Sequence, residues 1–153
     1  MATTVYNSPL GKLLIKAIDD HIIMITNEID DVMIQTINDN ELLEEAKRQL
    51  DEYFAGKRKI FTLPLAFNGT KYRQTVWKEL LKIPYGTTIS YGELAAAIGN
   101  DKGARSVGMA CGENKIMIVV PCHRVIGKNG KLTGYSGGIE IKKQLLELEN
   151  NNE

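Results

Sequence analysis

The chain has 153 residues, and its 19 basic and 19 acidic side chains give a formal net charge of zero. The composition is typical of a soluble globular protein, with 43% hydrophobic and 25% charged residues. No apolar run approaches the length that crosses a bilayer, and the N-terminus lacks the basic and apolar segments of a secretory signal. We therefore expect a cytoplasmic protein with no membrane contact, whose two cysteines are both thiols.

The charge is divided unevenly along the chain. Residues 1–71 carry 8 Lys or Arg and 11 Asp or Glu, a balance of −3. Residues 72–153 carry 11 and 8, a balance of +3. A basic C-terminal half favours contact with a polyanion such as a nucleic acid.

The first part of the chain predicts strands followed by a helix. Apolar runs within residues 3–28 are separated by turn residues, with a hairpin connection expected at Asp19-Asp20-His21. His21 is interpreted as a solvated turn residue. Residues 39–55 have apolar positions at helical spacing and predict a helix that ends at Gly56. Residues 60–70 predict a linker between two parts of the chain.

The second part predicts a helix-turn-helix. A helix is expected from Lys71 to Lys82. Ser90 and Glu93 form a capping box, in which each side chain satisfies a free backbone N–H, and they predict the start of a short helix that reaches Ile98. A turn and a further helix over residues 103–111 follow. Cys111 lies on the inward face of that helix and is interpreted as a core residue.

Residues 116–120, Ile-Met-Ile-Val-Val, predict a fully buried strand. Pro121 cannot donate to a sheet ladder, so it ends the strand and favours a sharp turn. Such a turn would bring the side chains of Cys122 and His123 to one pocket. A cysteine needs a base or a positive neighbour to become a thiolate, and a histidine is the usual one.

The last helix is predicted over residues 140–150, with Ile141, Leu145 and Leu148 buried. Glu149 lies four residues after Leu145 and so falls on the same apolar stripe. A buried carboxylate there needs a partner, because an unpaired buried charge is costly. The spacing alone is equally consistent with a solvated helix end.

The pentapeptide Pro121-Cys122-His123-Arg124-Val125 resembles the active-site motif of the O6-alkylguanine-DNA alkyltransferases, also called methylated-DNA–protein-cysteine methyltransferases. Residues 67–149 carry further motifs in the order and spacing of that family, whereas the first 60 residues match only in general layout. These further motifs are Phe67-Asn68-Gly69-Thr70, Ile83-Pro84-Tyr85-Gly86, Ser90-Tyr91-Gly92-Glu93-Leu94-Ala95, Ala104-Arg105-Ser106-Val107-Gly108, Asn114, and Thr133-Gly134-Tyr135-Ser136-Gly137-Gly138.

The resemblance implies an α/β (α+β) fold with two domains. Residues 1–66 would form an RNase H-like domain with a small antiparallel sheet and a helix. Residues 67–153 would form a mostly helical domain that contains a winged helix-turn-helix and accepts the alkyl group. The basic loop over residues 127–131 would be the wing, although a solvated turn explains its sequence equally well.

The activity implied by the resemblance is direct DNA repair by irreversible, stoichiometric alkyl transfer from O6-alkylguanine to Cys122. O4-alkylthymine is a second candidate substrate. His123 would be the base, and Glu149 would orient it to complete a Cys-His-Glu relay. Asn114 would tie the recognition helix to the active-site strand, although Lys115 stands where the family often has proline. Tyr91 would stabilise the departing guanine.

The implied partner is double-stranded DNA approached from the minor-groove side by a monomer, with no cofactor. Some members of the family bind zinc in the N-terminal part, but we expect no metal here, because the chain's Cys and His residues are only His21, Cys111, Cys122 and His123. Arg105 would enter the duplex and fill the gap left by a flipped base, since O6 of a stacked, paired guanine is out of reach. The resemblance marks as DNA-binding Ala104, Arg105, Gly108, Met109, Arg124 and Lys128. It marks as contacts to the base Tyr91, Val125, Tyr135 and Ser136.

Two other classes of protein remain open on the sequence alone. A cysteine hydrolase would use Cys122, His123 and Glu149 with multiple turnovers, and it would need an oxyanion hole. An alkyltransferase-like damage sensor would bind the lesion without reacting, but sensors of that kind lack the reactive cysteine that stands here at position 122.

Overall fold

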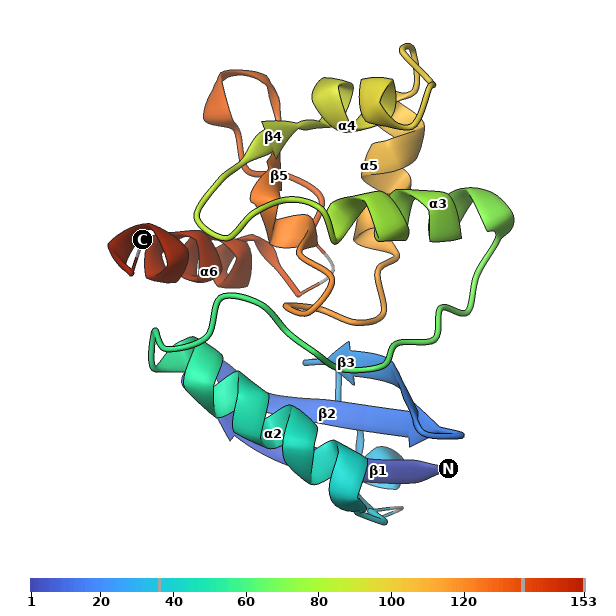
Figure 1. Ribbon diagram of the computed structural model, residues 1–153, viewed down its shortest axis with the longest axis vertical. Helices are drawn as coiled ribbons and strands as arrows, with labels where there is room; N and C mark the ends of the chain where they lie inside the picture. The colour runs from blue at the N-terminus through green and yellow to red at the C-terminus, as the bar shows by residue number, and fades with distance from the viewer. Residues whose placement is uncertain (36, 136, 153) are drawn as a thin grey trace. The chain divides into compact units, whose positions relative to one another are not determined.

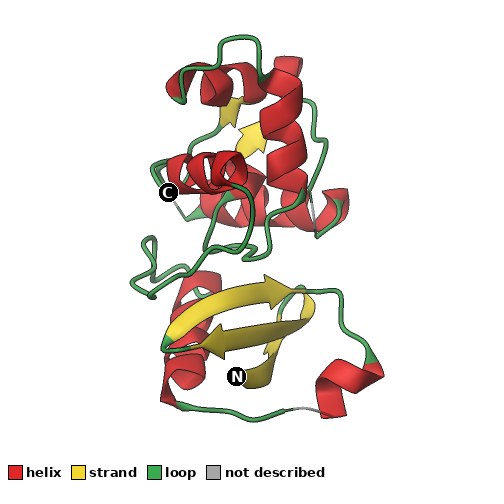
Figure 2. Cartoon of the chain, turned by 90° about the vertical axis from the view of Figure 1, so that its right-hand side faces the viewer, coloured by secondary structure: helices red, strands yellow, loops and turns green. Residues whose placement is uncertain are grey.

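The computed structural model describes residues 1–35, 37–135 and 137–152. The chain forms two compact units, Met1–Phe67 and Asn68–Glu153. The first unit holds the larger sheet, and the second is mostly helical (Figures 1 and 2). Within the described residues, no helix is long and apolar enough to cross a membrane.

The sheet of the first unit is antiparallel and has the order β1-β2-β3. Its strands are β1 (Ala2–Ser8), β2 (Gly11–Ile18) and β3 (His21–Thr26). Asp19 and Asp20 connect β2 to β3 with φ angles of 50° and 62°, the left-handed backbone of a tight hairpin turn. This confirms the predicted hairpin, and His21 is exposed at its edge.

Helix α2 (Glu41–Phe54) packs against this sheet. Asn40 caps it by accepting a hydrogen bond from the backbone N–H of Leu43. Its buried face contains Leu43, Ala46, Gln49, Leu50 and Tyr53. The Tyr6 hydroxyl donates to Asp51 at 2.6 Å and so joins β1 to the helix. A short helix, α1 (Asp31–Gln35), follows the strands and was not predicted from the sequence.

The second unit is built on helices that enclose one short parallel strand pair. The helices are α3 (Lys71–Leu80), α4 (Tyr91–Ala97), α5 (Ala104–Gly112) and α6 (Ile139–Asn151). Strand β4 (Ile89–Ser90) pairs with β5 (Val125–Ile126). The Trp77 indole N–H donates to the carbonyl of Ala110 at 2.9 Å and locks α3 to α5.

Helices α4 and α5 form the predicted helix-turn-helix. The capping box is present at the start of α4, since Ser90 accepts from the Glu93 N–H and Glu93 accepts from the Ser90 N–H. The turn ends at Gly103, where an added Cβ would lie only 2.1 Å from the side-chain amide of Asn100. A larger residue there would force the Asn100 side chain to move.

The predicted strand over residues 116–120 is wrong, because the structure has a buried series of turns there. Ile118 has a φ of 74°, which no strand residue adopts. The Asn114 side chain supplies the hydrogen bonds that a sheet partner would give, accepting from the Ile116 N–H and donating to the Val120 carbonyl. Burial explains the apolar residues, so their composition did not distinguish a turn from a strand.

The predicted sharp turn after Pro121 is confirmed. Residues Cys122–Arg124 form one turn of 3-10 helix that leads directly into β5. The loop after β5 contains a second such turn, Lys128–Gly130, and is closed by a hydrogen bond from the Gly127 N–H to the Lys131 carbonyl at 2.7 Å. The Lys128 side chain is exposed on this loop.

Candidate active site

Cys122 is buried at the start of the 3-10 turn, with only 1% of its surface exposed. The Asn114 amide donates to its sulfur at 3.2 Å. Burial raises the pKa of the Cys122 thiol to about 11, and the Asn114 hydrogen bond and the charge of Lys142 act in the opposite direction. The thiol is therefore protonated at neutral pH, and a base must remove its proton before it can act as a nucleophile.

His123 and Glu149 form a fully buried pair. Nε2 of His123 lies 2.6 Å from Oε2 of Glu149. A carboxylate only accepts hydrogen bonds, so the imidazole donates from Nε2 and keeps a lone pair on Nδ1. Within the described part of the chain, Nδ1 has no hydrogen-bond partner. The side chain of Glu149 is 1% exposed, so the helix end is not solvated at this residue.

Burial is the main influence on the pKa of His123, which it lowers, while the hydrogen bond to Glu149 raises it in part. A lowered pKa keeps the imidazole neutral at neutral pH. A neutral imidazole with a bare Nδ1 has the form that a general base needs.

Arg124 does not face outward, which corrects the expectation that it contacts DNA. Its guanidinium donates from Nε and Nη2 to the two oxygens of Glu149, at 2.8 and 3.0 Å, and from Nη1 to the Ile83 carbonyl at 2.7 Å. The residue is 6% exposed. A cation beside the motif looked like a phosphate contact, but the 3-10 turn directs it inward to the carboxylate.

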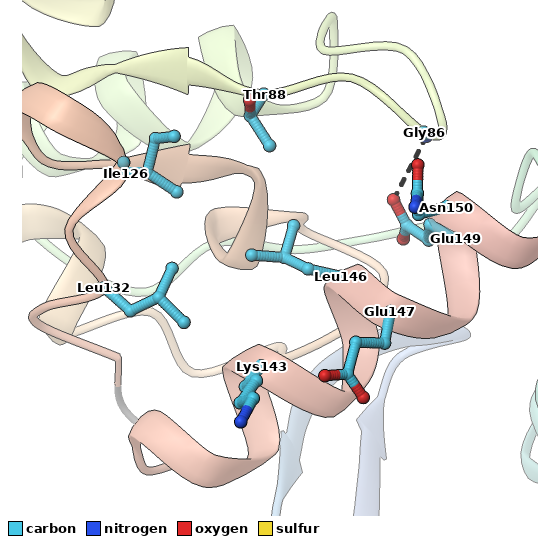
Figure 3. Close-up of a pocket in the computed structure, with 10 residues that line it drawn as sticks. Gly86, Thr88, Ile126, Leu132, Lys143, Leu146, Glu147, Glu149 and Asn150 are labelled. Atoms are coloured by element: carbon cyan, nitrogen blue, oxygen red, sulfur yellow. Dashed lines mark hydrogen bonds between the residues drawn. The ribbon is translucent and has the colours of Figure 1, made fainter.

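Glu149 also accepts from the backbone N–H of Gly86 at 3.2 Å (Figure 3). Its carboxylate thus accepts hydrogen bonds from three residues: the backbone of Gly86 and the side chains of His123 and Arg124. These hydrogen bonds outweigh the effect of burial and hold the pKa of Glu149 far below its usual range. The group is ionised at any pH at which the protein is used.

Lys142 is a site residue that the sequence prediction missed. Its side chain is fully buried, and its ammonium donates to the Thr133 carbonyl at 2.9 Å and to the Tyr91 hydroxyl at 3.3 Å. Burial lowers the pKa of Lys142, against the attraction of Cys122 and Cys111. The buried face of α6 consists of Lys142, Leu145 and Glu149. The position of Lys142, three residues before the core residue Leu145, was the sequence signal that could have predicted its burial.

Tyr91 is half-buried at the first turn of α4. Its hydroxyl donates to the Thr133 carbonyl at 2.7 Å and accepts from Lys142. Both partners lie outside α4, so the hydroxyl points away from its own helix toward the segment that precedes α6. Tyr91 is therefore neither a fully buried core residue nor a tyrosine whose hydroxyl lacks hydrogen-bond partners. It is a donor held in position by a buried cation.

The predicted base contacts lie near the relay where the structure describes them. Val125 is buried in β5, and Tyr135 is buried with its ring edge-on to His123 at a centroid distance of 6.5 Å. An added Cβ at Gly137 would lie 2.7 Å from Met117 and 2.8 Å from the Tyr135 ring, so only glycine allows this close approach. Ser136 lies outside the described residues.

Helix α5 presents a mixed exposed face. Ala104, Arg105 and Met109 are exposed, and Met109 has 63% of its surface in solvent. Gly108 is half-buried, and the opposite, buried side of the helix consists of Val107, Ala110 and Cys111. Burial raises the pKa of Cys111 to about 12, and its position confirms that it is a core residue.

Glu149 is also one of the residues that line a pocket of about 380 Å³ (Figure 3). It is formed by α6, the loop at Gly86 and the loop after β5, with Ile126, Leu132 and Leu146 as its apolar part. Cys122 does not line it. Within the described residues, no group of three His, Cys, Asp or Glu side chains is arranged to hold a metal ion.

Comparison with known proteins identifies the family. Residues 1–67 match the 6-O-methylguanine DNA methyltransferase, ribonuclease-like domain, and residues 71–151 match the DNA binding domain of the same family. The chain belongs to the 6-O-methylguanine DNA methyltransferase family.

Individual relatives are similar over nearly the whole chain. A methylated-DNA–protein-cysteine methyltransferase from Methanosarcina acetivorans is 44% identical, over 97% of this chain and 98% of its own. The constitutive one from Bacillus subtilis is 47% identical, over 95% and 93%. The crystal structure of Mycobacterium tuberculosis OGT in complex with DNA superposes with a TM-score of 0.91 and 43% identity, covering 99% of this chain and 94% of that one.

We predict that Lys142 favours the thiolate form of Cys122. Replacing it in Lys142→Met removes a buried positive charge, so the pKa of Cys122 should rise and the thiolate fraction at neutral pH should fall about tenfold for each pKa unit. The rate of Cys122 alkylation by iodoacetamide, mapped by peptide mass across a pH series, measures that fraction. The exposed neighbour gives a matched control, Lys143→Met, which should react like the wild type. Equal rates for both variants would contradict the prediction.

Proposed function

We propose that this protein repairs O6-alkylguanine in DNA by transferring the alkyl group to its own Cys122, with O4-alkylthymine as a second substrate class. The observation that carries the proposal is a buried thiol, hydrogen-bonded to Asn114, next to a neutral histidine that a buried carboxylate orients. Membership of the family and similarity to proteins named methylated-DNA–protein-cysteine methyltransferases support it.

The chemistry is a displacement at carbon. His123 accepts the thiol proton at Nδ1, through a water where needed, and Glu149 holds the imidazole in that tautomer. The sulfur forms a bond to the alkyl carbon as the bond from that carbon to O6 breaks. The electron pair goes to guanine, which leaves as an anion and takes up a proton. The Tyr91 hydroxyl, once it releases the Thr133 carbonyl, donates a hydrogen bond to that anion. The thioether has no route back to a thiol, so each molecule reacts once.

The base would enter from the exposed face of α5. Arg105 is exposed there and is four residues from Met109, so both side chains project from one side of the helix. In the proposed complex this face lies in the minor groove, Ala104 and Gly108 allow close approach, and Arg105 replaces the flipped base. Lys128, exposed on the loop after β5, would contact phosphate.

The base contacts complete the proposal. The extruded guanine would lie against Tyr135 and meet the Val125 carbonyl and the Ser136 N–H. The protein would act as a cytoplasmic monomer. Similarity to a structure solved in complex with DNA supports duplex DNA as the partner.

Stoichiometric reaction at Cys122 is the first prediction from this function. Incubation with excess DNA containing O6-methylguanine should add one methyl group per protein and then stop, as read by intact mass. Cys122→Ala should remove the reaction and keep DNA binding, because the Cys122 side chain is buried and is not part of the exposed face of α5. The control Cys111→Ala should still accept one methyl group. Repeated turnover, or a methyl group on Cys111, would overturn the proposal.

Arg105 should serve base extrusion more than overall affinity. Unpairing and unstacking a base costs a few kcal/mol, so Arg105→Ala should slow repair of duplex DNA about tenfold or more. Reaction with free O6-benzylguanine needs no extrusion and should change less than about twofold on that account. Lys102→Ala, which removes an exposed cation just before α5, is the control and should slow neither reaction. An equal slowing of both substrates by Arg105→Ala would assign the arginine another role.

A further inference from the structure

We propose that Arg124 is a positioning residue that keeps the resting His123–Glu149 pair neutral at His123, so that Cys122 stays a thiol until a lesion is bound. The inference deepens the proposed function and rests on it. Nothing in the motif distinguishes this role from a phosphate contact. It follows from where the structure directs the guanidinium.

The guanidinium has a donor engaged at each of its three nitrogens. Nε and Nη2 form a two-pronged contact with the Glu149 carboxylate, and Nη1 holds the Ile83 carbonyl. Its central carbon lies 5.6 Å from the centroid of the Tyr85 ring, over its face. An arginine does not lose its proton in proteins, so this site carries a fixed positive charge against Glu149.

This fixed charge determines which ring nitrogen of His123 carries the proton. Since Arg124 keeps Glu149 ionised, the carboxylate can only accept from Nε2 of His123 at 2.6 Å. A protonated Glu149 would donate to that nitrogen and force the proton onto Nδ1. Arg124 therefore keeps the lone pair on the nitrogen that must accept the thiol proton.

The positive charge of Arg124 also makes protonation of His123 to the imidazolium less favourable. In a relay of three residues, the carboxylate stabilises the positive imidazole once it has taken a proton. Here Arg124 already balances the charge of Glu149, so a proton on His123 would leave a net positive charge in a fully buried site. Lys142 adds a second positive charge that opposes a proton on His123, and the Tyr135 ring lies edge-on to the imidazole.

The consequence is a nucleophile that is protected at rest. A thiol reacts far more slowly than a thiolate with stray electrophiles and oxidants. A protein that can use its cysteine only once gains from a resting thiol, and the Nδ1 lone pair remains available when the alkyl group arrives. The neutral pair is thus consistent with both the buried thiol and the single turnover.

Histidine NMR tests the protonation state directly. The chain has two histidines, so ¹⁵N-histidine labelling gives one signal from His123 and one from exposed His21, which serves as the reference. In the wild type, His123 should be neutral at neutral pH, with its proton on Nε2. A wild-type His123 that is cationic at neutral pH would overturn the proposal without any variant, even if alkyl transfer proceeds.

Removing the charge should shift the titration and the kinetics together. In Arg124→Met, His123 should take up a proton at higher pH, by about one unit or more, because the fixed positive charge that opposes the imidazolium is gone. Because only the neutral imidazole can accept the thiol proton, the acidic limb of the rate–pH profile with free O6-benzylguanine should move to higher pH by the same amount. The conservative variant Arg124→Lys, which returns the charge, should restore most of the wild-type profile. Arg73→Met, which removes an exposed ion pair with Glu113 in the same unit, should leave it unchanged.

A purely structural role predicts a different result. It would slow Arg124→Met by the same factor at every pH, with an unshifted His123 signal, and that outcome would overturn the proposal. If Arg124→Met does not fold, the wild-type signal and Arg124→Lys still decide. A wild type that shows no alkyl transfer at all would instead contradict the proposed function, because the histidine titration does not depend on it.

Discussion

The buried carboxylate of Glu149 is the interaction on which the second unit depends. It joins the last helix to the 3-10 turn through His123 and Arg124 and to the loop before β4 through the Gly86 N–H. Removing one partner of such a buried group leaves an uncompensated charge and costs about 3–5 kcal/mol. The motif and the C-terminal helix, 26 residues apart, therefore form one structure, and the chemistry of Cys122 depends on both.

Local chemistry made several elements predictable from the sequence. The capping box at Ser90, the hairpin turn at Asp19 and Asp20, and the turn after Pro121 each depend on a few adjacent residues, and each is present. The position of Glu149, four residues after Leu145, was equally consistent with a solvated helix end, and it was the resemblance to the family that paired it with His123. Its contact with His123 needed the structure, since spacing on one helix says nothing about what lies opposite.

What sequence reasoning missed was decided by contacts between distant segments. The apolar run at residues 116–120 is buried, but the hydrogen bonds of Asn114 make it a series of turns. Arg124 and Lys142 are charged residues that pattern rules place in solvent or on DNA. Both are buried because each has polar partners inside the unit. Arg124 donates to the Glu149 carboxylate, and Lys142 donates to the Thr133 carbonyl and the Tyr91 hydroxyl. No local signal shows such partners, although the position of Lys142 beside Leu145 on the helix stripe was informative.

The central claim is that Glu149 prepares His123 to take the proton of Cys122, and Glu149→Gln tests it most directly. The variant keeps the shape, removes the negative charge and leaves Arg124 uncompensated. Single-turnover transfer should be slower than in the wild type at neutral pH, and the defect should shrink as pH rises and hydroxide replaces the base. DNA affinity should be nearly unchanged, and Glu147→Gln, on the exposed side of the same helix, should behave like the wild type. Transfer by Glu149→Gln as fast as the wild type at neutral pH would contradict the account.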